Sequence, residues 1–369
     1  MDGGGNADDP LVLPIAEVDA VPDLVGRRVL HVVQKYSSGV GSAIAQYTRS
    51  LPEVEHHLLS GTAVDAEGDL AEQADFAGTW RMDGGHLSKV RRVAEVVREL
   101  QPDVVHAHSS HGGLYARLGV RRTAHPIVYT PHCYGFERQD VSAPVRAAFW
   151  LAEAVLAVNT SAFAACADRE LQLSDWPTRH APRFVVPNIA PAATTTHRPR
   201  TAGPRLVAGG GRLAPQKDPA FFLAAVTALR ATEPDLRAVW LGDGPAEEKA
   251  ALEGGGVAVS GWMPRGEAMA VLAEADLYLH SARWEGFPLM VAEAAALRVP
   301  TLVRSVPSFA DLPRELTLHG STDLAGALAL LAEPAAAAAN VSCWSSVLQS
   351  NTTAGQRAAL VDVYRGQLT

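Results

Sequence analysis

The amino-acid sequence predicts an α/β protein with two Rossmann-like domains that face each other across a cleft. The chain has 369 residues, which is more than one hydrophobic core usually supports, and its 47% of hydrophobic residues can fill two cores. Short β-branched runs alternate with longer helical patterns, as in parallel, doubly wound sheets. This alternation breaks once, over residues 187–204, and then restarts.

The first half starts with a buried strand at residues 28–33 and a helix over residues 42–51. A second helix is predicted over residues 87–100, because apolar side chains recur on one face and basic side chains occupy the others. The other strands predicted in this half span residues 103–108, 126–130, 154–159 and 183–187.

Residues 187–204 are rich in Pro, Thr and Ala and lack an apolar period, which predicts an interdomain linker that acts as a hinge. Beyond it the clearest helix is predicted over residues 218–231. The strands predicted in this half span residues 205–210, 237–244, 257–261, 277–281 and 300–304. Ligands of such sheets bind outside the carboxyl ends of the strands, so the cleft is the predicted site.

These patterns predict three parts: a disordered acidic tail at residues 1–26, a first domain at 27–190 and a second at 203–350. The tail carries six acidic residues and no basic one, so most of the net charge of −8 lies there and the body is a poor nucleic-acid binder. The last helix, residues 353–369, presents apolar side chains on one side and is expected to pack back onto the first domain.

Cys133, Cys166 and Cys343 fit neither a disulfide framework nor a zinc site, which indicates free thiols in a reducing compartment. The sequence shows no secretory signal and no apolar stretch long enough to span a membrane, so we expect a cytoplasmic protein. It contains no phosphate-binding P-loop and no Asp-x-Asp pair, so no metal and no cofactor are expected. The turn at Gly242 begins like the glycine-rich fingerprint of dinucleotide-binding proteins, but Glu247 stands where that fingerprint has its third glycine.

Two glutamates, Glu285 and Glu293, occur in the segment WEGFPLMVAEAAA. Glu285 follows a predicted strand, and Pro288 suits the first turn of a helix. The backbone N–H groups of Phe287 and Leu289 would then form an anion site, while Glu293 could reach a ribose diol. The alternative is that both glutamates only complement the helix dipole.

Two cations, Arg212 and Lys217, bracket a loop in GGGRLAPQKD after a predicted strand. A departing diphosphate needs such partners because it gains charge as its bond to a sugar breaks. In the first half, Gly39 and Gly41 of SSGVGS allow close approach to a phosphate, and His132 follows a strand toward the cleft. The alternatives are that Arg212 and Lys217 lie in a solvated loop, that the two glycines form an ordinary turn, and that His132 has a structural role.

Taken in order, these motifs resemble one large family. The order is a glycine turn, T-P-H, V-V-P-N, G-R-L-x-P-x-K-D, G-D-G-P and finally E-G-F-P-L with the second glutamate. The sequence is similar to retaining glycosyltransferases of the GT-B architecture, in the group called glycosyl transferases group 1. The resemblance runs from about Arg28 to Pro300.

This resemblance implies that the second domain binds a nucleoside-diphosphate sugar and the first binds a glycan, glycolipid or small-molecule acceptor. Arg212 and Lys217 would neutralise the diphosphate. Glu285 and His132 would face the donor sugar, and Glu293 would bind the ribose. Further substrate contacts are implied for Gly39, Gly41, Gly286, Phe287, Pro288 and Leu289.

The family transfers sugars with retention of configuration and without a metal. Ser38 and Pro288 stand where many relatives have glycine. The alternatives are a non-catalytic sugar-nucleotide-binding protein and a GT-B isomerase. The basic helix at residues 87–100 admits a peripheral contact with the inner face of a membrane, although a solvated helix face is the simpler interpretation.

Overall fold

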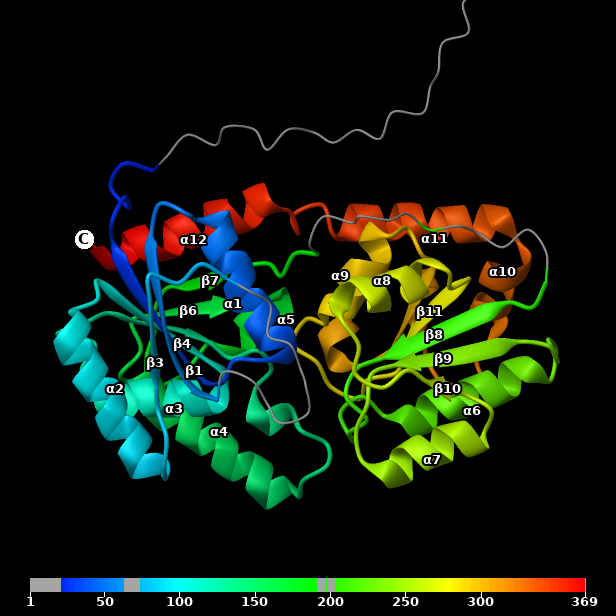
Figure 1. Cartoon of the computed structure of the whole chain (residues 1–369), viewed down its shortest axis with the longest axis horizontal. Coiled ribbons are helices and arrows are strands. Elements are labelled where there is room, and N and C mark those ends of the chain that lie inside the picture. The colour runs from blue at the N-terminus through cyan, green and yellow to red at the C-terminus, as the bar shows by residue number, and fades with distance from the viewer. Residues whose placement is uncertain (1–20, 63–73, 191–196, 198–202, 369) are drawn as a thin grey trace, which may run out of the picture.

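The computed structural model describes residues 21–62, 74–190, 197 and 203–368. Two α/β domains lie side by side, and each has a parallel sheet covered by helices on both faces (Figure 1). The predicted α/β architecture of two domains is therefore confirmed.

The first sheet has seven strands in the order β3-β2-β1-β4-β5-β6-β7, and neighbouring strands are parallel throughout. Its strands are β1 (Arg28–Lys35), β2 (Glu55–Thr62), β3 (Gly78–Arg81), β4 (Val104–His108), β5 (Ile127–Thr130), β6 (Ala162–Ala165) and β7 (Arg183–Val185). Because the sheet is covered on both faces, the central strands β1, β4, β5 and β6 are almost entirely buried.

Two sets of helices cover this sheet. One face packs against α2 (His86–Leu100), α3 (Ser109–Gly119) and α4 (Ala143–Ala157), and the other against α1 (Ser38–Ser50) and the final helix α12 (Thr353–Leu368). Leu360, Val363 and Tyr364 of α12 are buried in one cluster with Val29 of β1. A short helix α5 (Asp168–Leu173) follows β6, and a 3-10 turn spans Gly135–Glu137.

Some predictions for this half are wrong. Residues 154–159 do not form a strand, because α4 continues to Ala157 and β6 begins only at Ala162. The apolar run is misleading because α4 exposes large apolar side chains, while Glu153 on its buried side pairs with Arg117 at 2.8 Å. Strands β2 and β3 are missing from the prediction, since polar residues interrupt the apolar run of β2.

The predicted disordered tail falls partly outside the described residues, which begin at residue 21. For residues 21–26 the prediction is wrong. Leu24 is fully buried beside α12, and the carboxylate of Asp23 pairs with Arg365 at 2.7 Å. The burial of Leu24 against α12 therefore orders this segment despite its acidic composition.

The second sheet has six strands in the order β10-β9-β8-β11-β12-β13. Its strands are β8 (Leu206–Gly210), β9 (Arg237–Leu241), β10 (Ala258–Val259), β11 (Leu277–His280), β12 (Thr301–Arg304) and β13 (Thr317–Leu318). Its helices are α6 (Pro219–Arg230), α7 (Ala246–Gly254), α8 (Arg265–Ala273), α9 (Leu289–Ala296), α10 (Ala325–Ala332) and α11 (Pro334–Val347), with 3-10 turns at Pro307–Phe309 and Arg314–Leu316.

The chain crosses between the domains before β8 and again between α11 and α12 (Figure 1). The two crossings are tied together, because Asn351 donates to the carbonyl of Asn188 at 2.7 Å and Gln356 donates to that of Pro187 at 2.8 Å. Most of the predicted linker, residues 191–196 and 198–202, lies outside the described residues.

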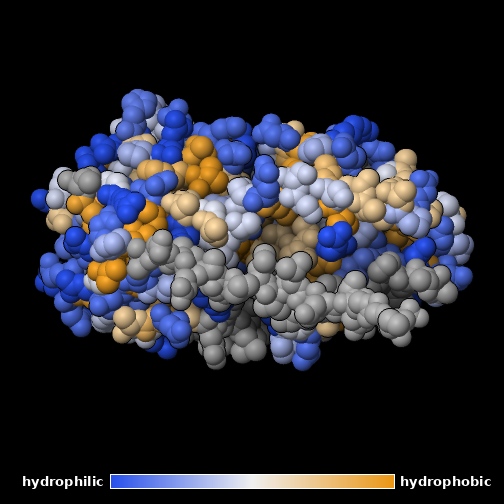
Figure 2. Space-filling view, turned by 90° about the horizontal axis from the view of Figure 1, so that it is seen from above, coloured by the Kyte–Doolittle hydropathy of each residue, from blue (hydrophilic) through white to orange (hydrophobic). Residues whose placement is uncertain are grey.

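Polar side chains cover most of the face on which α11 and α12 lie, with hydrophobic ones in separate patches (Figure 2). Within the described part of the chain, no single helix has the length and apolarity needed to cross a membrane. Helices α10 and α11 meet that criterion only as a pair, bent by 111°.

Candidate active site

Two cavities adjoin each other between the domains. The first, of about 480 Å³, is lined by both domains, and the second, of about 650 Å³, lies mostly against the second domain. The residues that line both cavities are Gly39, Arg212, Gln216, Lys217, Pro288 and Leu289. The loop after β8 and the start of α9 therefore form a shared wall.

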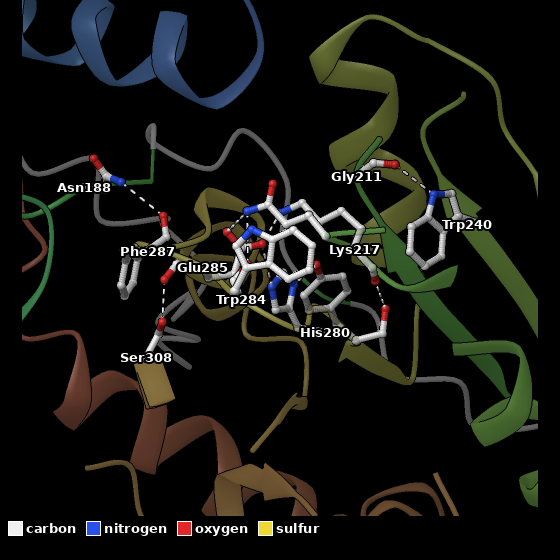
Figure 3. Close-up of polar contacts among 12 residues, drawn as sticks. Asn188, Gly211, Lys217, Trp240, His280, Trp284, Glu285, Phe287 and Ser308 are labelled. Carbon is white, nitrogen blue, oxygen red and sulfur yellow. Dashed lines mark hydrogen bonds and ion pairs between the residues drawn. The ribbon is translucent and has the colours of Figure 1, made fainter. Parts of the chain in front are cut away.

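The loop after β8 holds the two predicted cations at this wall. Lys217 donates to Oε1 of Glu285, and its own carbonyl accepts from Ser281 at 2.6 Å (Figure 3). Arg212 is exposed, and no residue in the described ranges bonds or pairs with it. The loop thus offers one paired and one unpaired cation to the cavities.

Glu285 is 7% exposed and lies among groups that stabilise its charge. Besides Lys217, the imidazole Nε2 of His280 lies 3.3 Å from its Oε1. Ser308 donates to the backbone carbonyl of Glu285 and so holds the main chain in place (Figure 3). Burial raises the pKa of Glu285, but the Lys217 ammonium and the His280 ring outweigh it and lower the pKa to about 2. Glu285 is therefore ionised at neutral pH.

Glu293 projects from α9 into the second cavity and is also paired. Arg265, the first residue of α8, donates to its Oε1, and another guanidinium nitrogen of Arg265 lies 3.4 Å from Ser42 Oγ in α1. Helix α9 begins at Leu289, and the Val291 N–H already donates to the Pro288 carbonyl at 3.1 Å, so the N–H groups of Leu289 and Met290 are the ones that lack partners within the helix. Such a helix end favours an anion.

The glycines of SSGVGS do not form a loop, which corrects the prediction. Helix α1 already begins at Ser38, so Gly39 and Gly41 belong to its first turn. Gly39 lines both cavities, whereas Gly41 lines neither and faces the backbone of Tyr36, 3.4 Å from where a Cβ would lie. That distance is an ordinary van der Waals contact, so packing onto Tyr36 does not by itself require a glycine at position 41.

His132 follows β5 and lines the first cavity. It and Cys133 adopt positive φ angles of 50° and 82°, and the Cys133 N–H donates to Glu170 Oε1 at 2.6 Å. Gly286 of the second domain abuts this turn, because a Cβ there would lie 2.9 Å from the Cys133 nitrogen. Burial lowers the pKa of His132 to about 4, so its ring is neutral at neutral pH.

Several site residues are missing from the sequence-based prediction. Gln216 donates to the carbonyl of Trp284 at 3.1 Å, and Asn188 donates to that of Phe287 at 3.2 Å (Figure 3). The sequence-based prediction also lacks Arg265 and His280. His280 was detectable as the polar end of a predicted strand, whereas nothing local in the sequence marks Arg265 as a partner of Glu293.

The structure also gathers three buried histidines, His31, His106 and His108, whose nitrogens lie within 4.8 Å of one another. Their sequence spacing shows no metal pattern, because the parallel register of β1 and β4 brings them together. They lie in the first domain, and none of them lines either cavity.

Comparison with known families decides the identity. Residues 28–189 match the model described as Glycosyl transferase 4-like domain, and residues 204–345 match the model described as Glycosyl transferases group 1. The chain is a group 1 glycosyltransferase. This glycosyltransferase is 23% identical, over 77% of its length and 82% of the relative's, to a 41.2 kDa protein in the cps region of Klebsiella pneumoniae.

A second relative is the UDP-Gal:alpha-D-GlcNAc-diphosphoundecaprenol alpha-1,3-galactosyltransferase of Escherichia coli. The identity is 24% over 58% of the glycosyltransferase, which spans only 60% of that relative's length.

Solved structures agree on the fold. A sucrose-phosphate synthase of Thermosynechococcus elongatus superposes with a TM-score of 0.75 at 16% identity, over 92% of the glycosyltransferase and 98% of the synthase. Anabaena HepE in complex with UDP-glucose superposes with a TM-score of 0.72 at 13% identity, over 92% of the glycosyltransferase and 99% of HepE. The fold of this glycosyltransferase is GT-B.

Proposed function

We propose that this glycosyltransferase moves a sugar from a nucleoside diphosphate to an acceptor hydroxyl with retention of configuration and without a metal. The observation that carries the proposal is the wall shared by the two cavities, where the cations of the β8 loop meet the start of α9. A diphosphate on this wall would place the nucleoside beside Glu293 and the sugar beside Glu285.

The charges suit that reaction. The bond between the sugar C1 and the diphosphate oxygen breaks, a bond from C1 to the acceptor oxygen forms, and the acceptor proton passes to a phosphate oxygen of the leaving group. Arg212 and Lys217 stabilise the charge that grows on the diphosphate. The ionised Glu285 stabilises the positive charge that develops on the sugar ring.

The acceptor that we propose is a lipid-linked glycan at a membrane surface. The exposed large apolar residues of α4 and its end are Val145, Phe149, Trp150, Leu151, Val155 and Val158. Helix α2, with its basic side chains, lies on the same face of the sheet, opposite α12 (Figure 1). Helix α3 lies between α2 and α4, so the apolar patch and the basic helix share one face without adjoining each other. Apolar and basic residues on one face favour an anionic bilayer. The name of the Escherichia coli relative, which includes diphosphoundecaprenol, also favours this acceptor class.

Binding and transfer experiments test the donor half of this proposal. Isothermal titration with UDP, GDP and their sugars should identify one nucleotide, and labelled sugar should pass to a lipid extract with retained anomeric configuration and undiminished rate in excess EDTA. Binding without transfer would favour the non-catalytic alternative, and turnover without acceptor would favour an isomerase. Loss of transfer in EDTA, restored by Mg²⁺, would refute the metal-independent mechanism.

Vesicle sedimentation tests the membrane contact. Anionic vesicles should retain the protein, and Val155→Gln should reduce the bound fraction, because Val155 of α4 is 62% exposed. Val25→Gln is the matched control, because Val25 is 57% exposed but lies outside α4. Equal loss in both variants would contradict a role for α4.

A further inference from the structure

Four histidines form a continuous hydrogen-bonded line across the first sheet. His56 lies in β2, His31 in β1, His108 at the end of β4 and His132 just after β5, and these four strands are successive neighbours in the sheet. The ring nitrogens of successive histidines are 2.9, 3.0 and 3.1 Å apart. We call these four residues the histidine relay. It begins deep in the domain and ends at the first cavity.

The start of the relay sets its direction. Nε2 of His56 lies 2.9 Å from the carbonyl oxygen of Leu51, and a carbonyl can only accept. His56 therefore carries its proton on Nε2 and accepts on Nδ1. In neutral rings this choice propagates: His31 donates from Nε2 to His56, His108 donates from Nε2 to His31, and His132 donates from Nε2 to His108.

The rings stay neutral because those of His31, His56 and His108 are buried and that of His132 is half-buried. Burial lowers the pKa of His56 and of His132 to about 4, and burial together with the neighbouring histidines lowers the pKa of His31 and His108 well below the usual value. The reversed arrangement would point the lone pair of His56 Nε2 at the lone pairs of the Leu51 carbonyl. Leaving such a buried group unsatisfied costs about 1 to 3 kcal/mol. One set of tautomers is thus preferred.

We propose that the histidine relay holds His132 as its Nε2–H tautomer, so that Nδ1 is an acceptor for a hydroxyl group of the sugar in the first cavity. Within the described part of the chain Nδ1 has no hydrogen-bond partner, and His132 lines that cavity. His31, His56 and His108 are then positioning residues that act through His132. The inference rests on the proposed sugar transfer only for the identity of the hydroxyl.

Neighbouring His106 is not part of the relay. Its ring nitrogens bond Tyr364 Oη at 2.9 Å and Thr130 Oγ1 at 2.8 Å, although its centroid lies 4.2 Å from that of His108. Every ring nitrogen of His31, His106 and His108 has such a partner, so these three histidines are satisfied without a cation.

Nitrogen NMR of ligand-free protein tests the tautomers directly. Long-range proton–nitrogen spectra of ¹⁵N-histidine-labelled protein should show His132 protonated on Nε2 and bare on Nδ1. His31→Phe removes the acceptor of His108, so His132 should become a mixture of tautomers. His31→Asn should restore the wild-type spectrum, because its amide oxygen can accept from His108. His106→Phe, an equally buried control, should leave the tautomer of His132 unchanged.

Kinetics of the same variants connect the tautomer to the site. His31→Phe should lower kcat/KM for the donor about 3- to 10-fold, the effect of one weakened hydrogen bond, and leave the Kd of the nucleoside diphosphate unchanged because that ligand lacks the sugar. A wild-type His132 protonated on Nδ1, an unchanged tautomer in His31→Phe, or a stoichiometric zinc ion in purified protein would overturn the relay. The spectra need no donor, so a failure of the proposed transfer would be recognised separately.

Discussion

The ammonium group of Lys217, which lines both cavities, is bound to the carboxylate of Glu285, which lines the first. A cation expected to hold the diphosphate is therefore already neutralised by a residue expected to face the sugar. An incoming diphosphate must share Lys217 with Glu285, whereas Arg212 has no such competitor among the described residues. This competition makes specific predictions about both partners.

Removing the charge of Glu285 should separate nucleotide affinity from turnover. In Glu285→Gln, Lys217 is free to bind phosphate, so nucleoside diphosphate should bind with equal or about 5-fold higher affinity, an effect of about 1 kcal/mol. The rate should fall about 100-fold, because no carboxylate opposes the charge on the sugar. Titration calorimetry and steady-state kinetics measure the two quantities. Full turnover, or a loss confined to nucleotide affinity, would contradict a sugar contact for Glu285.

Removing Lys217 should lower both activity and stability. Lys217→Ala leaves Glu285 as a buried carboxylate without its cation, which costs about 1 to 3 kcal/mol. Turnover should fall about 100- to 1000-fold as the leaving group loses a donor. The double variant Lys217→Ala with Glu285→Gln removes the orphaned charge, so its melting temperature should recover while turnover stays low. If stability and turnover recovered together, Lys217 would have only a structural role.

The contact of Gly286 with the His132 turn predicts a steric block to domain closure. A Cβ in Gly286→Ala would lie 2.9 Å from the Cys133 nitrogen and 3.1 Å from Cys166 Sγ, and the backbone cannot yield cheaply. A displacement of this size should lower kcat about 10- to 100-fold. Nucleotide affinity should persist, because the second cavity lies mostly in one domain. Gly254→Ala, which meets nothing within 4 Å, is the control. Equal rates in the two variants would exclude this contact as a determinant of closure.

Most of the architecture could be read from the sequence because both sheets are parallel and covered on two faces. Their central strands are mostly apolar, as in β1 and β11, and the carboxyl ends of such strands meet at one edge. That rule is why Lys217, Glu285 and His132, which are far apart in sequence, line one cavity. The assignment of apolar runs to buried strands failed at α4, where exposed apolar residues produce the same sequence pattern.

The pairing within the site could not be read in this way. Lys217 with Glu285, and Arg265 with Glu293, are contacts set by the register and loop paths of the folded chain. The histidine relay shows the same limit. His31 and His108 lie in or at the end of predicted strands, but only the pairing of β1 with β4 brings their rings to 3.0 Å.

The buried histidines predict a loss of stability in mild acid. Their folded-state pKa values lie below the usual 6.5, at about 4 for His56 and His132, so below pH 6.5 the unfolded chain binds more protons. Stability should be full above pH 6.5 and fall between pH 6.5 and 4, by about 1.4 kcal/mol per pH unit for each such histidine. Calorimetric melting at pH 7, 6 and 5 measures how the free energy of unfolding changes with pH. His106→Phe should reduce this slope by the contribution of one histidine. A melting temperature constant over this range would show that the histidines are not buried in their neutral form.

The pair of Arg265 and Glu293 predicts that the second glutamate controls nucleoside binding. Glu293→Gln loses the charge that would accept from a ribose hydroxyl and releases Arg265, so nucleoside diphosphate affinity should fall about 10-fold while the rate at saturating donor is kept. Analogues that lack the 2′ or 3′ hydroxyl identify the contact. Wild-type protein and Glu285→Gln should bind the matching deoxy analogue about 10-fold more weakly than the parent nucleotide, whereas Glu293→Gln should bind both alike, because the two changes remove the same interaction. An additive loss in Glu293→Gln would mean that the carboxylate acts only through Arg265 and does not touch the ribose.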